Sequence, residues 1–324
     1  MLNKGRLFFF LRLLVSFLII AFIISKVNFE EIALLLPKIK LPFVLLGLLW
    51  LLFDRVIMSY RWAILLWAKE IRIPIYNIIK IYFLSSFWST FLPSSVAPDL
   101  IKVYVARKHS SNTNTSDVIS SVVVDRVIGL LSLSLVAFLS IFVLFSYSRT
   151  RENFNILTTV LIILFLTILV VVFFDRMPLK RFQKFFRIRE DGFLGRKLTV
   201  FYDSCKEYMT NKAALFKVFS ISFVNNILAI LMIYVIGLSL DLHVSILHLF
   251  VFVPLVNFII MIPISVGGIG VQEGAYVYFL SQIGMSVQEA LAVALILRGL
   301  MIVSYLPGGL VYMSDGFAIK KASL

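Results

Sequence analysis

Charged residues and cysteine are both scarce in this sequence. Only 15% of the 324 residues are charged and 60% are hydrophobic, whereas soluble domains contain about 25% charged and 45–50% apolar residues. The mean hydropathy is +0.99. This composition excludes an ordinary soluble enzyme and predicts an all-α, polytopic membrane protein.

The single cysteine and the three histidines limit the chemistry further. Cys205 has no second cysteine in the chain, so an intramolecular disulfide is excluded. The sequence contains neither a His-Glu-x-x-His nor a Gly-x-Ser-x-Gly motif, so a zinc hydrolase or a serine hydrolase is not indicated. We therefore expect no metal, no cofactor and no catalytic residue.

Long apolar runs are the dominant feature. Six are near the roughly 20 residues that cross a bilayer core, and we predict spanning helices at Leu7–Ile24, Pro42–Met58, Val127–Tyr147, Ile156–Phe174, Phe216–Leu238 and Ala290–Met313. Two shorter runs, Ile79–Leu92 and Leu249–Ile262, are followed by Pro93 and Pro263. Their length and these prolines predict two re-entrant helical segments.

The basic residues indicate the orientation. With both termini in the cytoplasm, most of the 31 lysines and arginines lie inside, and the external loops hold only Lys26, Lys38, Lys40, Arg149 and Arg151. The positive-inside rule therefore supports this orientation, and we expect an integral protein of a prokaryotic inner membrane. We expect one membrane domain, with a first half at 1–174, a basic cytoplasmic loop at 175–217 and a second half at 218–324. The loop either only fixes topology or also binds anionic lipid headgroups. The net charge of +14 is explained by the basic residues that set the topology. We therefore expect no nucleic acid as a binding partner.

The segments that start at the two prolines resemble each other weakly, as two copies of an internal repeat would. In order, the first copy has Pro93, Ser95, Val96 and Arg126, and the second has Pro263, Ser265, Val266 and Arg298. The charge distribution gives the two copies opposite orientations. An inverted repeat with broken helices is typical of alternating-access transporters, and a chance match in a leucine-rich chain is the alternative.

The densest candidate site is the segment that follows Pro263. Gly267, Gly268 and Gly270 permit a tight turn and close approach of the backbone to a ligand, or simply a hinge. A helix starting near Val271 directs free N–H groups and its positive dipole end at that turn, which favours a phosphate or carboxylate. We take these glycines with Gln272 and Glu273 as candidate substrate-binding residues. Glu273 is alternatively the anion that satisfies this helix end.

Charges inside the apolar spans also need a reason, since each costs about 2.5–3.5 kcal/mol near the bilayer centre. Arg126 and Arg298 either form ion pairs or hold a phosphate through bidentate hydrogen bonds. Asp54 and Asp125 are either their counter-ions or a proton-coupled pair. We include Arg126, Arg298 and Asp125 among the candidate substrate-binding residues.

Three further candidates lie near the first re-entrant segment and the second span. Asp99 and Lys102 are three residues apart, so they share a helix face and form either a site mouth or an interfacial ion pair. Arg61, beside Trp62, is read from the residues as an interfacial anchor.

At these residues the chain resembles the lysylphosphatidylglycerol synthase transmembrane-region family, also described as flippase-like membrane proteins. The family pattern has an arginine-tryptophan pair, a proline before Gly-Gly-Asp, an acidic-arginine pair, a Pro-x-x-x-Gly-Gly-x-Gly-x-x-Glu segment and a distal arginine. The corresponding residues are Arg61-Trp62, Pro93 to Asp99, Asp125-Arg126, Pro263 to Glu273, and Arg298. The first Gly-Gly is replaced by Ala97-Pro98.

The resemblance implies a stand-alone translocase, or flippase, for a phospholipid or a polyprenyl-linked lipid, with membrane lipids that carry anionic or phosphate-containing headgroups as partners. Because no ATP-binding motif occurs, we expect a transporter rather than an enzyme, with facilitated or ion-coupled transport. Two alternatives stay open. One is a membrane-embedded transferase acting on polyprenyl-phosphate sugars, with Asp99 or Asp125 as base or metal ligand. The other is a non-catalytic subunit with envelope-synthesis protein partners.

Overall fold

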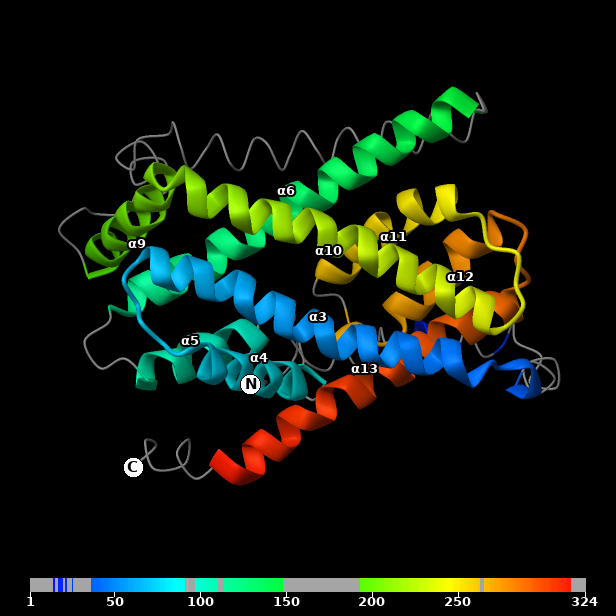
Figure 1. The fold of residues 1–324 in the computed structure, drawn as a ribbon, viewed down its shortest axis with the longest axis horizontal. Helices are drawn as coiled ribbons and strands as arrows, with labels where there is room; N and C mark the ends of the chain where they lie inside the picture. The colour runs from blue at the N-terminus through cyan, green and yellow to red at the C-terminus, as the bar shows by residue number, and fades with distance from the viewer. Residues whose placement is uncertain are drawn as a thin grey trace. The chain divides into compact units, whose positions relative to one another are not determined.

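The computed structural model describes residues 14, 17–19, 21, 25, 36–90, 92, 97–109, 114–147, 193–262 and 265–315 (Figure 1). Every secondary-structure element in these residues is helical. The elements are η1 (Leu36–Lys38), α3 (Leu41–Ala68), α4 (Ile75–Ser89), α5 (Ala97–His109), α6 (Thr115–Tyr147), α9 (Phe193–Thr210), α10 (Lys212–Ser239), α11 (Ile246–Met261), η2 (Val266–Gly268), α12 (Val271–Ser281) and α13 (Val287–Asp315). The all-α prediction is confirmed.

Four of the described helices, α3, α6, α10 and α13, are long and apolar enough to cross a bilayer. They contain the predicted spans Pro42–Met58, Val127–Tyr147, Phe216–Leu238 and Ala290–Met313, so the protein is a polytopic membrane protein as predicted. The helices are longer than these spans because the predicted bounds follow the apolar residues alone, whereas the helical backbone continues into the flanking polar residues. The predicted spans Leu7–Ile24 and Ile156–Phe174 lie largely or wholly outside the described residues.

The two predicted re-entrant segments coincide with short helices. α4 has 15 residues and α11 has 16, which at about 1.5 Å per residue is shorter than the roughly 30 Å hydrocarbon core. Pro93 and Pro263 lie outside the described residues. The re-entrant turns and the inverted repeat therefore stay predictions.

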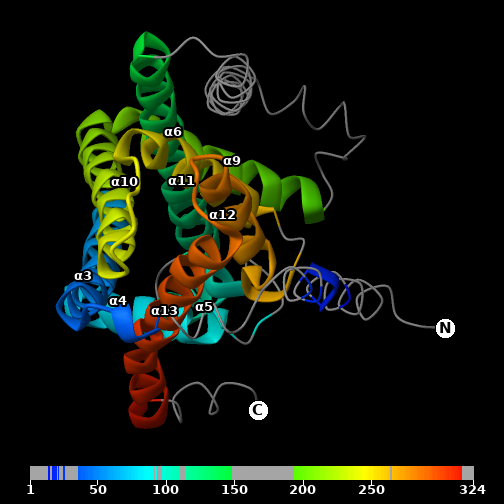
Figure 2. The same cartoon turned by 90° about the vertical axis from the view of Figure 1, so that its right-hand side faces the viewer.

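The chain forms two compact units, each assembled from separate segments. The first unit comprises Met1–Arg55, Tyr82–Leu100 and Ile227–Leu324, and the second comprises Val56–Ile81 and Ile101–Asn226. Within the first unit, α12 packs against both α11 and α13 (Figure 2). Within the second unit, α9 packs on α6 (Figure 1). The division of the sequence into halves around 175–217 stays a prediction.

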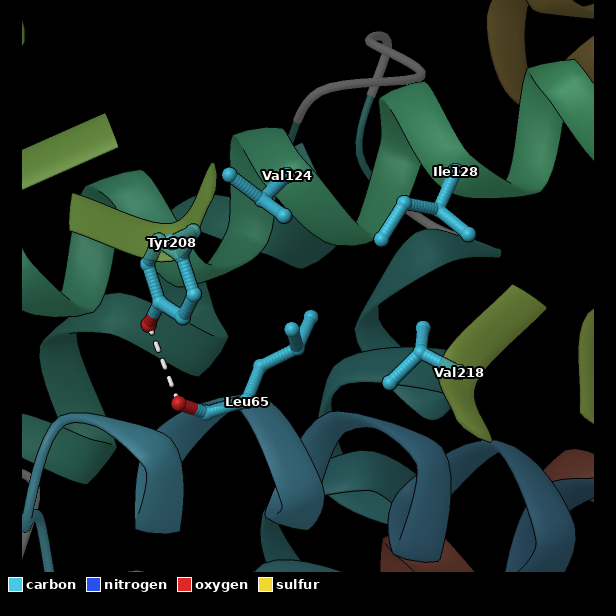
Figure 3. Close-up of a cluster of buried hydrophobic side chains, with 5 residues drawn as sticks. All are labelled: Leu65, Val124, Ile128, Tyr208 and Val218. Atoms are coloured by element: carbon cyan, nitrogen blue, oxygen red, sulfur yellow. Dashed lines mark hydrogen bonds between the residues drawn. The ribbon is translucent and has the colours of Figure 1, made fainter. Parts of the chain in front are cut away.

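An apolar cluster holds α9 in place in the second unit. The cluster consists of Leu65, Val124, Ile128, Tyr208 and Val218 (Figure 3). The Tyr208 hydroxyl at its edge donates a hydrogen bond of 3.0 Å to the Leu65 carbonyl of α3. Burial raises the pKa of the Tyr208 hydroxyl well above its usual range. The uncharged hydroxyl therefore serves as a donor that fixes α9 to α3.

The buried thiol of α9 gives a test of this packing. Burial raises the pKa of Cys205 to about 12, against the opposing effect of the nearby Lys69 ammonium. Because the thiolate is the nucleophile, we expect alkylation of the native protein to accelerate about tenfold per pH unit between about pH 8 and 10. Iodoacetamide labelling followed by mass spectrometry measures this rate. The denatured chain, whose thiol is exposed, should level off near about pH 9, and levelling off at that pH in the native protein would contradict the burial of this residue.

Candidate functional site

The glycine-rich segment forms a tight left-handed turn in the first unit. Gly267, Gly268 and Gly270 have φ angles of 58°, 72° and 83°, a region that residues with a Cβ rarely adopt. After this turn α12 begins at Val271. Both the turn and the start of the helix agree with the expectation from the sequence.

Arg298 of α13 and Glu273 of α12 fasten this turn. The Arg298 Nε donates to Glu273 Oε1 at 2.6 Å, while Nη1 and Nη2 donate to the carbonyl oxygens of Gly267 and Gly268, each at 3.1 Å. The second carboxylate oxygen, Glu273 Oε2, accepts the Gly270 N–H at 2.7 Å. Glu273 is thus both the anion at the start of α12 and the counter-ion of Arg298.

The guanidinium keeps unused hydrogen-bonding capacity in this arrangement. Arginine has five N–H groups in a planar fork, and the three bonds to Glu273, Gly267 and Gly268 leave one N–H on each terminal nitrogen. The Arg298 side chain is 17% exposed and that of Glu273 is 9% exposed. The N–H group that remains on each terminal nitrogen can donate a charge-assisted hydrogen bond to a phosphate or carboxylate oxygen.

A cavity of about 220 Å³ adjoins the fork. Isoleucine and methionine side chains from the end of α11, the glycine turn and α13 supply most of its apolar lining, and its polar lining side chains are Ser89, Thr90, Ser265, Gln272, Arg298 and Tyr305. Among the described residues, the Gln272 amide donates a hydrogen bond to the Met301 sulfur, at 3.6 Å, and thioether sulfur is a weak acceptor. The cavity therefore combines donors for a polar group with an apolar wall.

The turn glycines offer a direct mutational test. A Cβ added at Gly268 would lie 3.3 Å from the Ile260 side chain at φ +72°, whereas Gly284, at φ +88°, has no atom within 4 Å. We expect Gly268→Ala and Gly284→Ala to cost a similar backbone strain of about 1–2 kcal/mol. Because Gly284 does not line the cavity, only Gly268→Ala should also weaken the binding of an anion beside Arg298. Equal anion binding by both variants at equal folded yield would show that the turn serves folding alone.

The second unit contains a different buried ion pair. Arg61 Nη2 lies 2.6 Å from Asp125 Oδ2, and Arg61 Nη1 donates to Ser222 Oγ at 2.9 Å. The adjacent Trp62 is 1% exposed, and its Nε1 donates to Ser121 Oγ at 3.0 Å. The reading of Arg61-Trp62 as a lipid-facing interfacial anchor is therefore wrong, because both side chains point into the protein.

The structure assigns ion-pair partners to the intramembrane carboxylates. Asp125 forms an ion pair with Arg61, and Asp54 forms one with its neighbour Arg55 at 2.6 Å; the sequence offered both either as counter-ions for Arg126 or Arg298 or as a proton-coupled pair. Arg298 is neutralised by Glu273 instead.

The remaining candidates are divided between the units. Gly267, Gly268, Gly270, Gln272, Glu273 and Arg298 come together in the first unit, while Arg61, Lys102, Asp125 and Arg126 belong to the second. Asp99 belongs to the first unit and is 8% exposed. The Lys102 ammonium lies 5.9 Å from the centre of the Trp62 ring, and Arg126 is half-buried. Among the described residues, no group of three or more His, Cys, Asp or Glu side chains is placed to hold a metal.

Sequence reasoning missed Tyr305 and the Ser89–Thr90 pair as lining residues. Tyr305 follows Arg298 by seven residues, which is two helical turns on the same face, so the period of α13 could have identified it. Ser89 and Thr90 come from a distant part of the chain, and only the fold brings them to the glycine turn.

A family model described as the lysylphosphatidylglycerol synthase transmembrane region matches residues 9–309. No curated protein and no solved structure matches the chain. The matched region includes both the Arg298–Glu273 site and the Arg61–Asp125 pair.

Proposed function

Because the chain belongs to the lysylphosphatidylglycerol synthase transmembrane-region family, we propose that it is a lipid translocase, which moves the headgroup of a phospholipid or a polyprenyl-linked lipid across the membrane. Its apolar helices make it an integral membrane protein. The observation that carries the proposal is the cavity in which the Arg298 fork faces a mixed polar and apolar wall.

The chemistry of the cavity favours a phosphate-containing headgroup. The N–H groups that remain on the two terminal nitrogens of Arg298 can donate charge-assisted hydrogen bonds to phosphate oxygens. The first turn of α12 adds backbone N–H groups that have no partner within the helix, and its dipole favours an anion. Glu273 already neutralises the guanidinium, so a singly charged phosphodiester adds one negative charge to a site that is neutral overall. This balance allows the headgroup to be released as well as bound.

The size of the cavity favours partial enclosure of the lipid. Its volume of about 220 Å³ is below the roughly 300–1,000 Å³ of pockets that enclose a whole drug-sized ligand. A headgroup fits, whereas two acyl chains do not. In our proposal the chains stay in the bilayer while the headgroup crosses through the protein, and the apolar wall of α13 contacts the glycerol region.

The proposal includes the orientation of the protein in the membrane and its protein partners. We propose that both termini face the cytoplasm of a prokaryotic cell and that the lipid is supplied by, or delivered to, envelope-synthesis proteins. Cysteine-accessibility labelling at position 195, in the basic loop, tests the orientation. Labelling by an impermeant reagent from outside intact cells would overturn it.

Reconstitution tests the function itself. Purified protein is placed in liposomes with fluorescent phosphatidylglycerol or with a labelled polyprenyl phosphate sugar, and leaflet exchange and product formation are recorded together. We expect exchange of at least one of these lipids above that of protein-free liposomes, with no product. Metal-dependent product without exchange would support a transferase instead. Neither signal, together with a stable protein partner in pull-downs, would support an assembly subunit.

A further inference from the structure

A second cavity, lined only by apolar side chains, lies in the second unit. Its volume is about 260 Å³, and its wall consists of residues between Val123 and Leu131 of α6, Cys205 and Met209 of α9, and residues between Leu215 and Phe219 of α10. None of the lining side chains carries an oxygen or nitrogen atom. The cavity shares no lining residue with the one beside Arg298.

The wall that α9 contributes is held by specific contacts. Ser204 Oγ donates a hydrogen bond to Asp117 Oδ1 of α6 at 2.6 Å and lies 2.7 Å from Ser120 Oγ. The Tyr208 hydroxyl donates a hydrogen bond to the Leu65 carbonyl of α3. These residues flank Cys205 and Met209 on the same helix. The cavity is therefore a preformed feature of the packed unit, in keeping with its position beside the cluster of Figure 3.

The cavity is open toward the surroundings of two membrane helices. α6 and α10 both qualify as membrane spans, and the lining residue Phe216 is 71% exposed. On a helix that spans the membrane, we infer that such an exposed apolar side chain contacts lipid. A wall without polar atoms and a volume below that of a typical small-molecule pocket suit a single flexible hydrocarbon chain, and the unbranched Met209 can adapt to it.

Two basic residues are close in sequence to the α10 residues that line the cavity. Lys212 and Lys217, at the start of α10 on either side of Leu215 and Phe216, are both exposed. The acidic Glu207 on α9 is engaged by Lys69. Lysines beside a lipid-facing helix extend their ammonium groups toward the membrane surface and attract anionic headgroups.

We propose that this cavity binds one acyl chain of an anionic phospholipid whose phosphate lies at Lys212 and Lys217. The apolar wall favours a hydrocarbon chain of the lipid, and the two lysines favour a negatively charged headgroup. The site is separate from the cavity of Arg298, so it stands or falls independently of the proposed transport.

Photocrosslinking tests the site in the full-length protein. The protein is placed in phosphatidylcholine nanodiscs that contain a small share of phosphatidylglycerol with a diazirine on one acyl chain, and adducts are located by mass spectrometry. We expect adducts on residues 123–131 and 205–219. Val127→Phe fills the cavity and should lower their yield about tenfold. Leu139→Phe is the control, because Leu139 lies on α6 outside the cavity and is 45% exposed, and it should leave the yield unchanged.

A second pair of variants separates loss of the site from loss of the fold. Lys212→Gln and Lys217→Gln change exposed side chains only. Each should lower the preference for the phosphatidylglycerol probe over the matched phosphatidylcholine probe about fivefold, since one surface lysine contributes that much. Equal adduct yields in wild-type protein and Val127→Phe, or equal labelling of wild-type protein by the two probes, would overturn the proposal.

Discussion

Replacing Arg298 by lysine is expected to reduce leaflet exchange at least about tenfold while most of the protein stays folded. Lysine keeps the positive charge opposite Glu273, but it cannot reach the carbonyl oxygens of Gly267 and Gly268 at the same time. Its single ammonium also replaces the N–H groups that two terminal nitrogens of the guanidinium keep for a ligand. Exchange of fluorescent lipid in proteoliposomes, compared at equal amounts of folded protein, measures the effect.

Two further variants separate binding from folding at this position. Arg298→Ala leaves the Glu273 carboxylate buried without its counter-ion, so it should cost about 3–5 kcal/mol of stability and lower both folding and exchange. Arg298→Met combined with Glu273→Gln removes both charges and should recover much of the folded yield. If this double variant, or Arg298→Lys, exchanges lipid at the wild-type rate, Arg298 is structural and the headgroup assignment is wrong.

Gly308→Ala is expected to destabilise the fold clearly. Gly308 lies where α13 crosses α4, and a Cβ there would lie 2.1 Å from the Phe83 carbonyl oxygen and 2.8 Å from the Phe87 Cβ. Because the nearest atom belongs to the backbone, no side-chain rotation relieves the clash and the helices must separate. Small residues permit such close helix contacts in membranes. Overpacking of this kind costs about 1–3 kcal/mol or more.

Gly299 in the same helix provides the matched control. A Cβ at Gly299 meets no atom within 4 Å, so Gly299→Ala should be neutral or should stabilise the helix by about 0.5–1 kcal/mol. Thermal unfolding in detergent compares the two variants. Gly308→Ala should lower the midpoint clearly and Gly299→Ala should not. Equal midpoints would show that α13 and α4 do not approach each other this closely.

The helices and the turn could be predicted because they depend on local sequence. The apolar runs fix α3, α6, α10 and α13, and the spacing of the glycines before Val271 fixes both the turn and the start of α12. These features need no knowledge of distant residues. Even the dual role of Glu273 followed, in part, from its place in the first turn of that helix.

The ion pairs could not be predicted because they depend on how helices face one another. Residues adjacent in sequence point about 100° apart on a helix, and Asp125 of α6 meets Arg61 on α3. Asp54 nevertheless pairs with its own neighbour Arg55. Sequence alone cannot choose between these outcomes, since the choice depends on which helix packs against each face.

Blocking the cavity beside Arg298 tests the central claim most directly. In a Cys205→Ser background, Thr90→Cys places a thiol in the cavity wall, and Ser314→Cys places one on an exposed position of the same unit outside the cavity. Each variant is reacted to completion with a bulky methanethiosulfonate reagent, and leaflet exchange is recorded before and after modification. The account predicts that modified Thr90→Cys loses exchange, regains it on reduction, and that Ser314→Cys is unaffected. Unchanged exchange by fully modified Thr90→Cys would contradict it.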